Sequence, residues 1–341
     1  MITIEIIRSE KDWALLSKHW NELLSESITN SPFLRHEFLT SWWQYRGGGE
    51  WNSDELYILT GRTQGGELVG ALPLFLSKNH AEKPTFFLIG SIEIADILDI
   101  LVAPEYLKEF VDAALAHLTH PDTLEWEGLE LVNLLEDSPS LPVWQAAAEK
   151  HGLAYTQDRL QPSPYIPLPE DFDTYLDRLD GRYRREMVRK MRNALGYFIP
   201  VHVARITSPE GLHDEMEDFF TMMRENADKN RFLTDPMAAQ MHAVAQAAAE
   251  NGWLDLRFLV VGREKAAAYL NFIYDNKVWV YNSALGEKFA AISPGISLVG
   301  LLIQEAIEEG RTEFDLLRGD EEYKYQLGGQ DRWVVKAVIS R

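Results

Sequence analysis

The chain has 341 residues, of which 46% are hydrophobic and 25% are charged, a composition typical of a globular protein with a core of its own. Its length predicts about two domains. It contains no cysteine, which excludes disulfides, thiolate nucleophiles and cysteine-ligated zinc. The net charge of −20 argues against DNA binding. The nine histidines form no metal-binding motif, so no metal is expected. No apolar run has the length of a membrane span and no signal peptide is visible, so we expect a cytoplasmic protein without membrane insertion.

The first half of the chain alternates strand and helix patterns. A strand at 2–7 is followed by two helices, near 10–25 and 34–45. Three strands come next, and then a helix that begins at Pro104, a strand and a second helix. The three strands are expected at 54–62, 66–77 and 85–91. After the helix at Pro104, the strand is expected at 129–134 and the second helix at 142–152.

The second half repeats this order of elements. A strand at 201–206 precedes two helices, near 208–229 and 235–251. Three apolar runs separated by turn signals follow, at 253–262, 266–275 and 277–285. A Pro294-Gly295 pair then opens a long apolar helix that Gly310 ends. After it we expect a buried strand at 312–319, a loop or short helix, and a last strand at 333–340.

Two copies of one element order indicate an internal duplication. Several segments also carry a family likeness, and together they lie along nearly the whole chain. They are PFLRHEFLTSWW (32–43), GELVGALPLF (66–75), DILDILVAPE (96–105), SPG (293–295) and FDLLRGDEEYK (314–324). In this order they resemble the tandem-domain acyltransferases of the GNAT superfamily, the CelD-like and Fem-like type.

The resemblance implies an α/β (α+β) fold with two tandem GNAT-like domains, each a mixed central sheet flanked by helices. The N-terminal lobe, on the acceptor side, would span 1–170. A basic helix at 171–199 would bridge the lobes. The C-terminal lobe, at 200–341, would hold the acyl donor.

The helix opened by Pro294 has no acidic side chain before Glu305. Its first backbone N–H groups lack intrahelical partners, and the helix dipole adds positive charge there, so this end suits an anion. The resemblance implies that the anion is the pyrophosphate of acetyl-CoA or another acyl-CoA. An ordinary core helix begun by proline would show the same pattern. The expected donor-binding residues are Ser293, Gly295, Ile296, Ser297 and Leu298, with Tyr281 and Asn282 on the preceding strand.

The corresponding helix start in the first half has Glu105 after Pro104. A carboxylate there would repel pyrophosphate, so we expect only the second copy to bind the donor. Asp96 and Asp99, just upstream, are candidates for acceptor binding. Because aspartate is also a common turn and cap residue, a purely structural role is the alternative.

Residues 177–192 contain seven basic and three acidic side chains, a net charge of +4 in an acidic chain. Five arginines fall on one helix face, and apolar residues on the other face would pack against the protein. We favour pairing of the arginines with acidic residues of this chain; contact with a phosphate-bearing substrate or tRNA is the alternative. The five are Arg178, Arg182, Arg185, Arg189 and Arg192.

Polar side chains crowd the segment after the expected strand at 312–319, where α/β proteins tend to place their sites. Asp320 is a candidate general base, and Tyr323 a candidate acid toward the leaving sulfur. Lys324 is a third catalytic candidate, and either Lys324 or Arg318 could bind an anionic group of donor or acceptor. Arg318 and Asp315 are the substrate-binding candidates of this segment. A polar loop with internal salt bridges is the alternative.

The function implied is transfer of an acyl group, acetyl first among them, from acyl-CoA to an amine of a small-molecule, sugar or envelope-precursor acceptor. One alternative is a Fem-like ligase that uses aminoacyl-tRNA, which would need the basic helix exposed. The other is a catalytically degenerate GNAT module that binds a partner. The sequence leaves the acceptor, the acyl length and the oligomeric state open.

Overall fold

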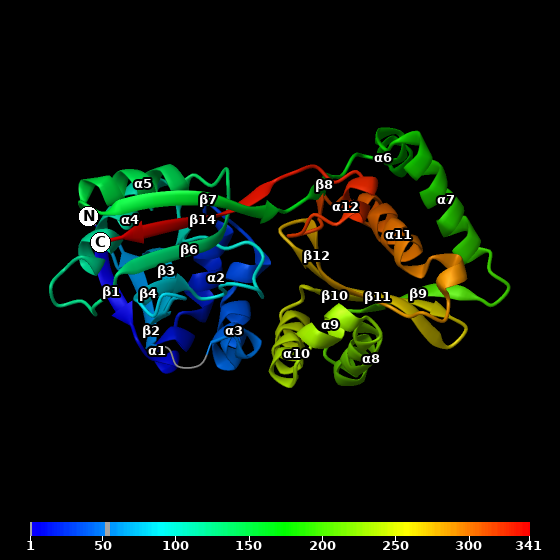
Figure 1. The fold of residues 1–341 in the computed structure, drawn as a ribbon, viewed down its shortest axis with the longest axis horizontal. Coiled ribbons are helices and arrows are strands. Elements are labelled where there is room, and N and C mark those ends of the chain that lie inside the picture. The colour runs from blue at the N-terminus through cyan, green and yellow to red at the C-terminus, as the bar shows by residue number, and fades with distance from the viewer. Residues whose placement is uncertain (1, 52–54) are drawn as a thin grey trace. The chain divides into compact units, whose positions relative to one another are not determined.

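The computed structural model describes residues 2–51 and 55–341. Contacts within the chain divide it into two units. Unit 1 comprises Met1–Gln161 and Trp333–Arg341, and unit 2 comprises Pro162–Arg332 (Figure 1). Residue 54, the first of the expected strand at 54–62, lies outside the described residues.

Unit 1 is built on one mixed sheet whose strands follow the order β1-β2-β3-β4-β6-β14-β7, with the short β5 paired to β3. Strands β4 and β6 pair in parallel, and β14 pairs antiparallel with β6. The strands are β1 (Thr3–Ile7), β2 (Glu55–Arg62), β3 (Leu68–Lys78), β4 (Pro84–Leu88), β5 (Leu101–Val102), β6 (Gly128–Leu135), β7 (Ala154–Pro162) and β14 (Trp333–Ser340).

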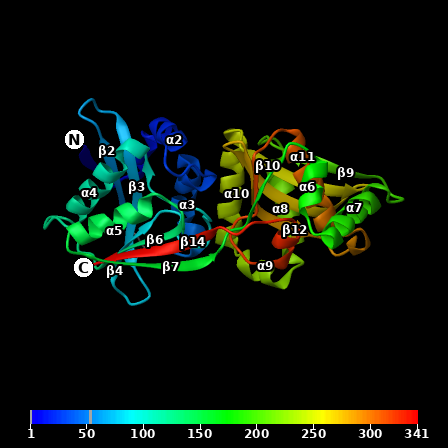
Figure 2. The same ribbon diagram turned by 90° about the horizontal axis from the view of Figure 1, so that it is seen from above.

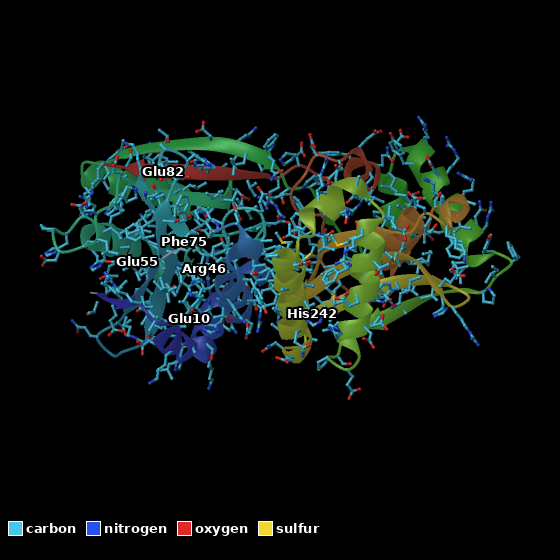
Figure 3. All side chains as sticks on the ribbon, turned by 60° about the horizontal axis from the view of Figure 1, so that its bottom comes forward. Glu10, Arg46, Glu55, Phe75, Glu82 and His242 are labelled. Carbon is cyan, nitrogen blue, oxygen red and sulfur yellow. The ribbon has the colours of Figure 1, made fainter. Side chains whose placement is uncertain are left out.

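The helices of unit 1 bury both faces of this sheet (Figure 2). They are α1 (Glu10–Ala14), α2 (Ser17–Ser25), α3 (His36–Gly49), α4 (Leu107–Leu118) and α5 (Ser140–Lys150), with single 3₁₀ turns at Pro32–Leu34 and Pro104–Tyr106. Phe75 on β3, labelled in Figure 3, shows why the core is well defined. Its ring packs against Trp42, Trp51 and Phe87 at centroid distances of 5.3, 4.9 and 5.6 Å.

Unit 2 contains a second mixed sheet, in the order β8-β13-β12-β11-β10-β9. The strands are β8 (Tyr165–Pro167), β9 (Val201–Ile206), β10 (Leu254–Val261), β11 (Glu264–Tyr274), β12 (Lys277–Leu285) and β13 (Glu313–Asp315). The helices are α6 (Phe172–Arg178), α7 (Gly181–Leu195), α8 (Leu212–Arg224), α9 (Ala227–Phe232), α10 (Asp235–Glu250), α11 (Pro294–Glu308) and α12 (Glu322–Gln326), with a 3₁₀ turn at Ala290–Ile292.

In unit 2, α7 and α11 cover one face of the sheet and α8 and α10 cover the other (Figure 1). This matches the hydrophobic patterns, because every residue of β10 is buried and α11 is apolar around most of its circumference. The expected elements occur in the predicted order, but the helices expected at 10–25 and 208–229 are each two helices. Strands β5, β7 and β8 were not expected, and one expected strand is much shortened. The strand expected at 312–319 ends at Asp315, since the Asp315 side chain accepts the Leu317 N–H at 2.9 Å and turns the backbone.

The expected lobe at 200–341 required the last strand of the chain to belong to the second sheet, but this strand belongs to the first sheet. β14 pairs instead with β6 of unit 1, and β8, upstream of position 170, pairs antiparallel with β13 of unit 2. Compared with the expected lobes, the two units therefore exchange strands: β14 joins the sheet of unit 1 and β8 joins the sheet of unit 2. Local pattern gives the strand character of a segment but not which sheet edge it joins.

The expected bridging helix at 171–199 is also corrected. It is two helices, α6 and α7, because Asp180 leaves the helical conformation and its side chain caps the Arg182 N–H at 2.8 Å. Both helices lie within unit 2. Met187 and Met191 of α7 are buried in the core that also contains α11, so this helix packs on the domain rather than bridging two.

Candidate active site in unit 2

The strands β12 and β13 part within unit 2. Their parallel pairing covers only Lys277–Trp279 against Glu313–Asp315, although β12 continues to Leu285. The pairing of β12 with β11 also shifts register at this point, between Val280 and Asn282. Backbone groups of β12 beyond Trp279 therefore have no β13 partner.

Helix α11 begins at Pro294, nine residues after the end of β12 at Leu285. Ser293 has a left-handed backbone (φ 49°) and no side chain caps the helix, whose first turn has no acidic residue. The Ser297 N–H donates to the Ser293 carbonyl at 3.0 Å, and the Ser297 hydroxyl to the Ile292 carbonyl at 2.9 Å. Because Pro294 has no N–H, the groups left for an anion are those of Gly295 and Ile296.

Two of the expected donor-binding residues, Ser297 and Leu298, are therefore not available to an anion. Ser297 already uses both of its donors within the protein, and Leu298 is fully buried. Gly295 also has a role that we did not expect, since a Cβ there would lie 2.6 Å from Leu285 Cδ2. The glycine thus allows close contact with β12, whether or not a phosphate binds.

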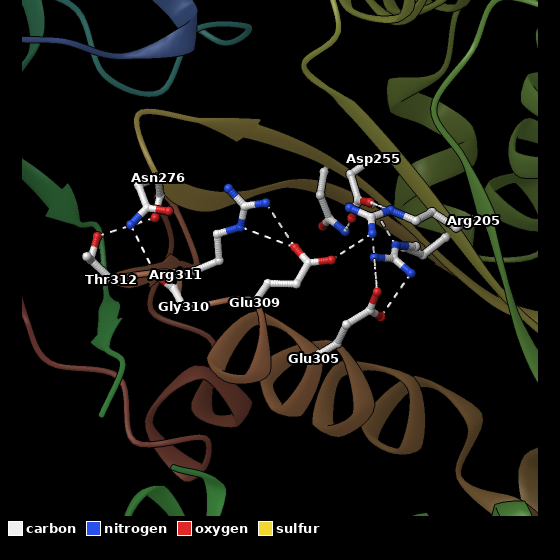
Figure 4. Close-up of polar contacts among 10 residues, drawn as sticks. Arg205, Asp255, Asn276, Glu305, Glu309, Gly310, Arg311 and Thr312 are labelled. Carbon is white, nitrogen blue, oxygen red and sulfur yellow. Dashed lines mark hydrogen bonds and ion pairs between the residues drawn. The ribbon is translucent and has the colours of Figure 1, made fainter. Parts of the chain in front are cut away.

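An ion-pair network holds α11 against the sheet (Figure 4). Arg257 on β10 is buried and forms two hydrogen bonds with Glu305 of α11, at 2.9 and 3.0 Å, and one with Asp255 at 2.8 Å. Arg205 on β9 joins Asp255 to Glu309 at 2.8 Å each. Because the network anchors the C-terminal half of α11, it fixes the direction in which the helix N-terminus points.

Lys324, expected to be catalytic or to bind an anion, is buried and structural. Its ammonium donates to the carbonyl oxygens of Leu317 and Arg318 at 3.0 and 2.6 Å and pairs with Glu321 at 3.0 Å. It closes the loop that follows β13 and is not accessible to a substrate in this conformation. The sequence could not show that its side chain folds back onto the loop.

Asp315 is likewise buried, which contradicts its expected contact with substrate. It forms an ion pair with Arg332 and accepts the Leu317 N–H. Asp320 is exposed and Arg318 is partly exposed in the same loop. Their expected roles remain predictions.

Tyr323, the candidate acid, and Ile296, a candidate donor-binding residue, lie together in the structure. They line one small groove together with Met187 and Lys190 of α7. Burial, with a smaller contribution from Glu321, raises the pKa of the Tyr323 phenol. The phenol therefore stays protonated at neutral pH and can donate a proton or hydrogen bond.

Lys229 of α9 is a residue that the sequence did not single out. Its ammonium donates to Asn282 Oδ1 and Ser283 Oγ, both at 3.2 Å, and to the Ser283 carbonyl. These contacts place it on β12 beyond the point where β13 departs. Burial lowers the pKa of Lys229 to about 8, opposed in part by Glu321. An ionisable group with such a pKa beside a strand opening is typical of a functional site, but no local motif announces it.

In unit 1 the corresponding opening is filled by the protein itself. β4 and β6 pair only over Thr85–Phe87 and Gly128–Glu130, and the segment that follows β4 occupies the edge beyond. The Leu98 N–H donates to the Asn133 carbonyl at 2.9 Å, and the Asn133 side chain donates to the Ala95 carbonyl at 2.8 Å. Glu105 lies in the first turn of the helix start, as the sequence indicated.

Asp99 belongs to this filling segment and cannot bind an acceptor as expected. It is fully buried and accepts hydrogen bonds from Thr29, Ser138 and Ser140 at 2.8, 2.5 and 2.8 Å. Burial raises the pKa of its carboxyl, and these hydroxyl donors oppose the shift. The alternative interpretation of Asp99, a structural cap, is therefore the one the structure favours. Asp96 is partly exposed, and its acceptor role remains a prediction.

Residues 181–325 match the family model described as an acetyltransferase (GNAT) domain. This segment contains the open strands, α11 and the Tyr323 groove. Unit 2 carries a GNAT domain. This match covers less than half of the chain; it confirms the predicted GNAT-type domain and supports an N-acyltransferase activity for that domain. No curated protein sequence gives a significant match to the chain.

Solved structures of similar fold extend over both GNAT-like units. FemX aligns over 98% of this chain and 96% of its own, with a TM-score of 0.65 and 12% identity. L-PGS from Bacillus licheniformis aligns over 98% and 92%, with a TM-score of 0.55 and 12% identity. The C-terminal domain of a putative lysylphosphatidylglycerol synthetase from Agrobacterium fabrum aligns over 96% and 92%, with a TM-score of 0.53 and 9% identity. At these identities the likeness concerns the fold alone.

Proposed function

We propose that the protein transfers an acyl group from acyl-CoA to an amine, with the donor bound in unit 2. The observation that supports this most directly is the parting of β12 and β13 beside a helix whose first turn carries no acid. The thioester arm of the donor would lie along β12 beyond Trp279, where β13 no longer pairs with it. Its pyrophosphate oxygens would accept hydrogen bonds from the N–H groups of Gly295 and Ile296.

The reaction needs two proton transfers besides orientation of the substrates. The amine nitrogen attacks the thioester carbonyl carbon, the C–S bond breaks, the nitrogen loses a proton and the sulfur gains one. We assign the proton-accepting role to the neutral form of Lys229, which its pKa of about 8 makes available near neutral pH. We assign the proton-donating role to the Tyr323 phenol, beside the start of α11.

Isothermal titration calorimetry with acetyl-CoA tests the donor assignment. We expect a single binding site per chain, because the chain fills the corresponding opening of unit 1. Two equivalent sites would contradict the assignment to unit 2 alone. Absence of acetyl-CoA binding, with binding of aminoacyl-tRNA instead, would favour the Fem-like alternative. The observation that supports the Fem-like alternative is the exposed row of arginines on α7.

The pH dependence of stability checks the environment of Lys229. Its pKa of about 8 lies below the ordinary 10.5, so between these values the unfolded chain binds a proton that the folded chain does not. The free energy of unfolding should therefore rise with pH across this window, by roughly 2–3 kcal/mol. Urea unfolding of wild type and Lys229→Met at about pH 7 and about pH 10 measures it. An equal rise in both proteins would show that other groups cause it.

A further inference from the structure

Helix α7 presents a row of exposed arginines to solvent. Within residues 2–51 and 55–341, none of the exposed Arg185, Arg189 and Arg192 forms an ion pair. Only their neighbours are engaged, Arg184 with Asp177 and Lys190 with Glu186. This differs from the internal pairing that we favoured from the sequence, so the row is available to an anionic partner.

Large apolar side chains are exposed along one border of the same row. Val188 is 41% exposed, Leu195 54% and Phe198, just after the helix, 82%. At about 100° per residue, Val188 and Leu195 fall between the buried methionines and the arginines. The Tyr197 ring lies 4.4 Å from that of Phe198. Figure 1 shows α7 on the outer side of α11, with the turn that follows extending away from the sheet. Basic and apolar groups thus share one surface.

The charge of the remaining chain favours a single orientation on any anionic partner. Residues 177–192 carry +4 of a total of −20, so all other residues together carry −24. The rest of the chain on average repels a polyanion, whereas this segment attracts one. RNA and an anionic bilayer both meet this condition, but exposed Val and Leu side chains have no favourable contact with phosphates, whereas they enter the headgroup region of a bilayer.

We propose that α7 and the Tyr197–Phe198 turn form a docking surface for an anionic phospholipid bilayer. The arginines bind headgroup phosphates, and Val188, Leu195 and Phe198 enter the interface between headgroups and acyl chains. Among the described residues no helix is long and apolar enough to cross a membrane, so the contact is peripheral. This inference does not depend on the identity of the acyl donor.

Vesicle sedimentation with the full chain tests the proposal. We expect binding to phosphatidylcholine vesicles that contain phosphatidylglycerol, weak binding to pure phosphatidylcholine, and loss at high salt. The variant Arg185→Gln/Arg189→Gln/Arg192→Gln should bind roughly 100-fold more weakly, at about 1 kcal/mol for each arginine. As a matched control, Lys11→Gln/Lys18→Gln/Lys108→Gln removes three exposed charges from unit 1 and should bind like wild type.

The apolar contact separates lipid from RNA. Leu195→Ser/Phe198→Ser should weaken vesicle binding roughly tenfold while its salt dependence stays the same. Because the chain has no cysteine, Phe198→Cys can carry a single environment-sensitive dye. The emission of this dye should shift to shorter wavelength on anionic vesicles. A dye at Gln64→Cys, in an exposed turn of unit 1, is the control, and its emission should not shift. All these positions are exposed, so thermal unfolding should change little.

Three results would overturn the proposal. The first is no difference between anionic and neutral vesicles. The second is arginine-dependent binding of tRNA without binding of vesicles, which would assign the surface to nucleic acid. The third is full vesicle binding by Leu195→Ser/Phe198→Ser with no emission shift at position 198, because the apolar side chains would then not enter the bilayer.

Discussion

Replacing Gly295 by glutamate is expected to weaken acetyl-CoA binding by roughly 2–4 kcal/mol, the range of one or two charge-assisted hydrogen bonds. The new carboxylate would lie at the start of α11, where we place the pyrophosphate, as Glu105 lies in the first turn of the corresponding helix of unit 1. The fold should survive, because a glutamate at a helix N-terminus suits the dipole. Calorimetry on wild type and variant measures the effect.

Gly295→Ala is the matched control. It introduces the same Cβ against Leu285, which is half exposed and can change rotamer, but no charge. We expect it to bind acetyl-CoA within about 0.5 kcal/mol of wild type. Equal losses in both variants would show that packing against Leu285, not phosphate repulsion, sets the affinity. No loss in Gly295→Glu would place the pyrophosphate elsewhere.

Replacing Arg257 by alanine should lower the free energy of unfolding of unit 2 by about 3–5 kcal/mol. Arg257 is 5% exposed and Asp255 2% exposed, and the change removes the bidentate partner of Glu305. Arg205 remains close to both carboxylates but already serves Glu309 as well. A buried carboxylate that loses its partner costs far more than an exposed pair gains.

Urea unfolding, together with hydrogen exchange of the α11 peptide, distinguishes local from global loss. The control is Lys288→Ala, which breaks the exposed pair with Glu264 in the same unit and should cost less than about 1 kcal/mol. We also expect Arg257→Ala to weaken acetyl-CoA binding, because α11 is no longer fixed against β10. A stability like that of the control would mean that the apolar core alone holds α11 in place.

Local sequence determined the elements and their duplication. The alternation of β9, the Pro-Gly start of α11 and the apolar runs of β10, β11 and β12 are properties of short segments, so periodicity and turn residues reveal them. The difference between the two helix starts was visible for the same reason, because Glu105 and Gly295 occupy corresponding positions in the chain. From these features we predicted that the second copy binds the donor.

The tertiary structure decided what depends on partners far away in the chain. The exchange of β14 and β8 is a choice among sheet edges that no short segment specifies. Lys324 and Asp315 had the right composition for a site, but the loop after β13 folds back and buries both. Lys229 stands in an unremarkable helical segment, and only the fold brings its ammonium to Asn282 and Ser283, where burial lowers the pKa. Side-chain direction and desolvation depend on tertiary packing, so they could not be predicted from short segments of the sequence.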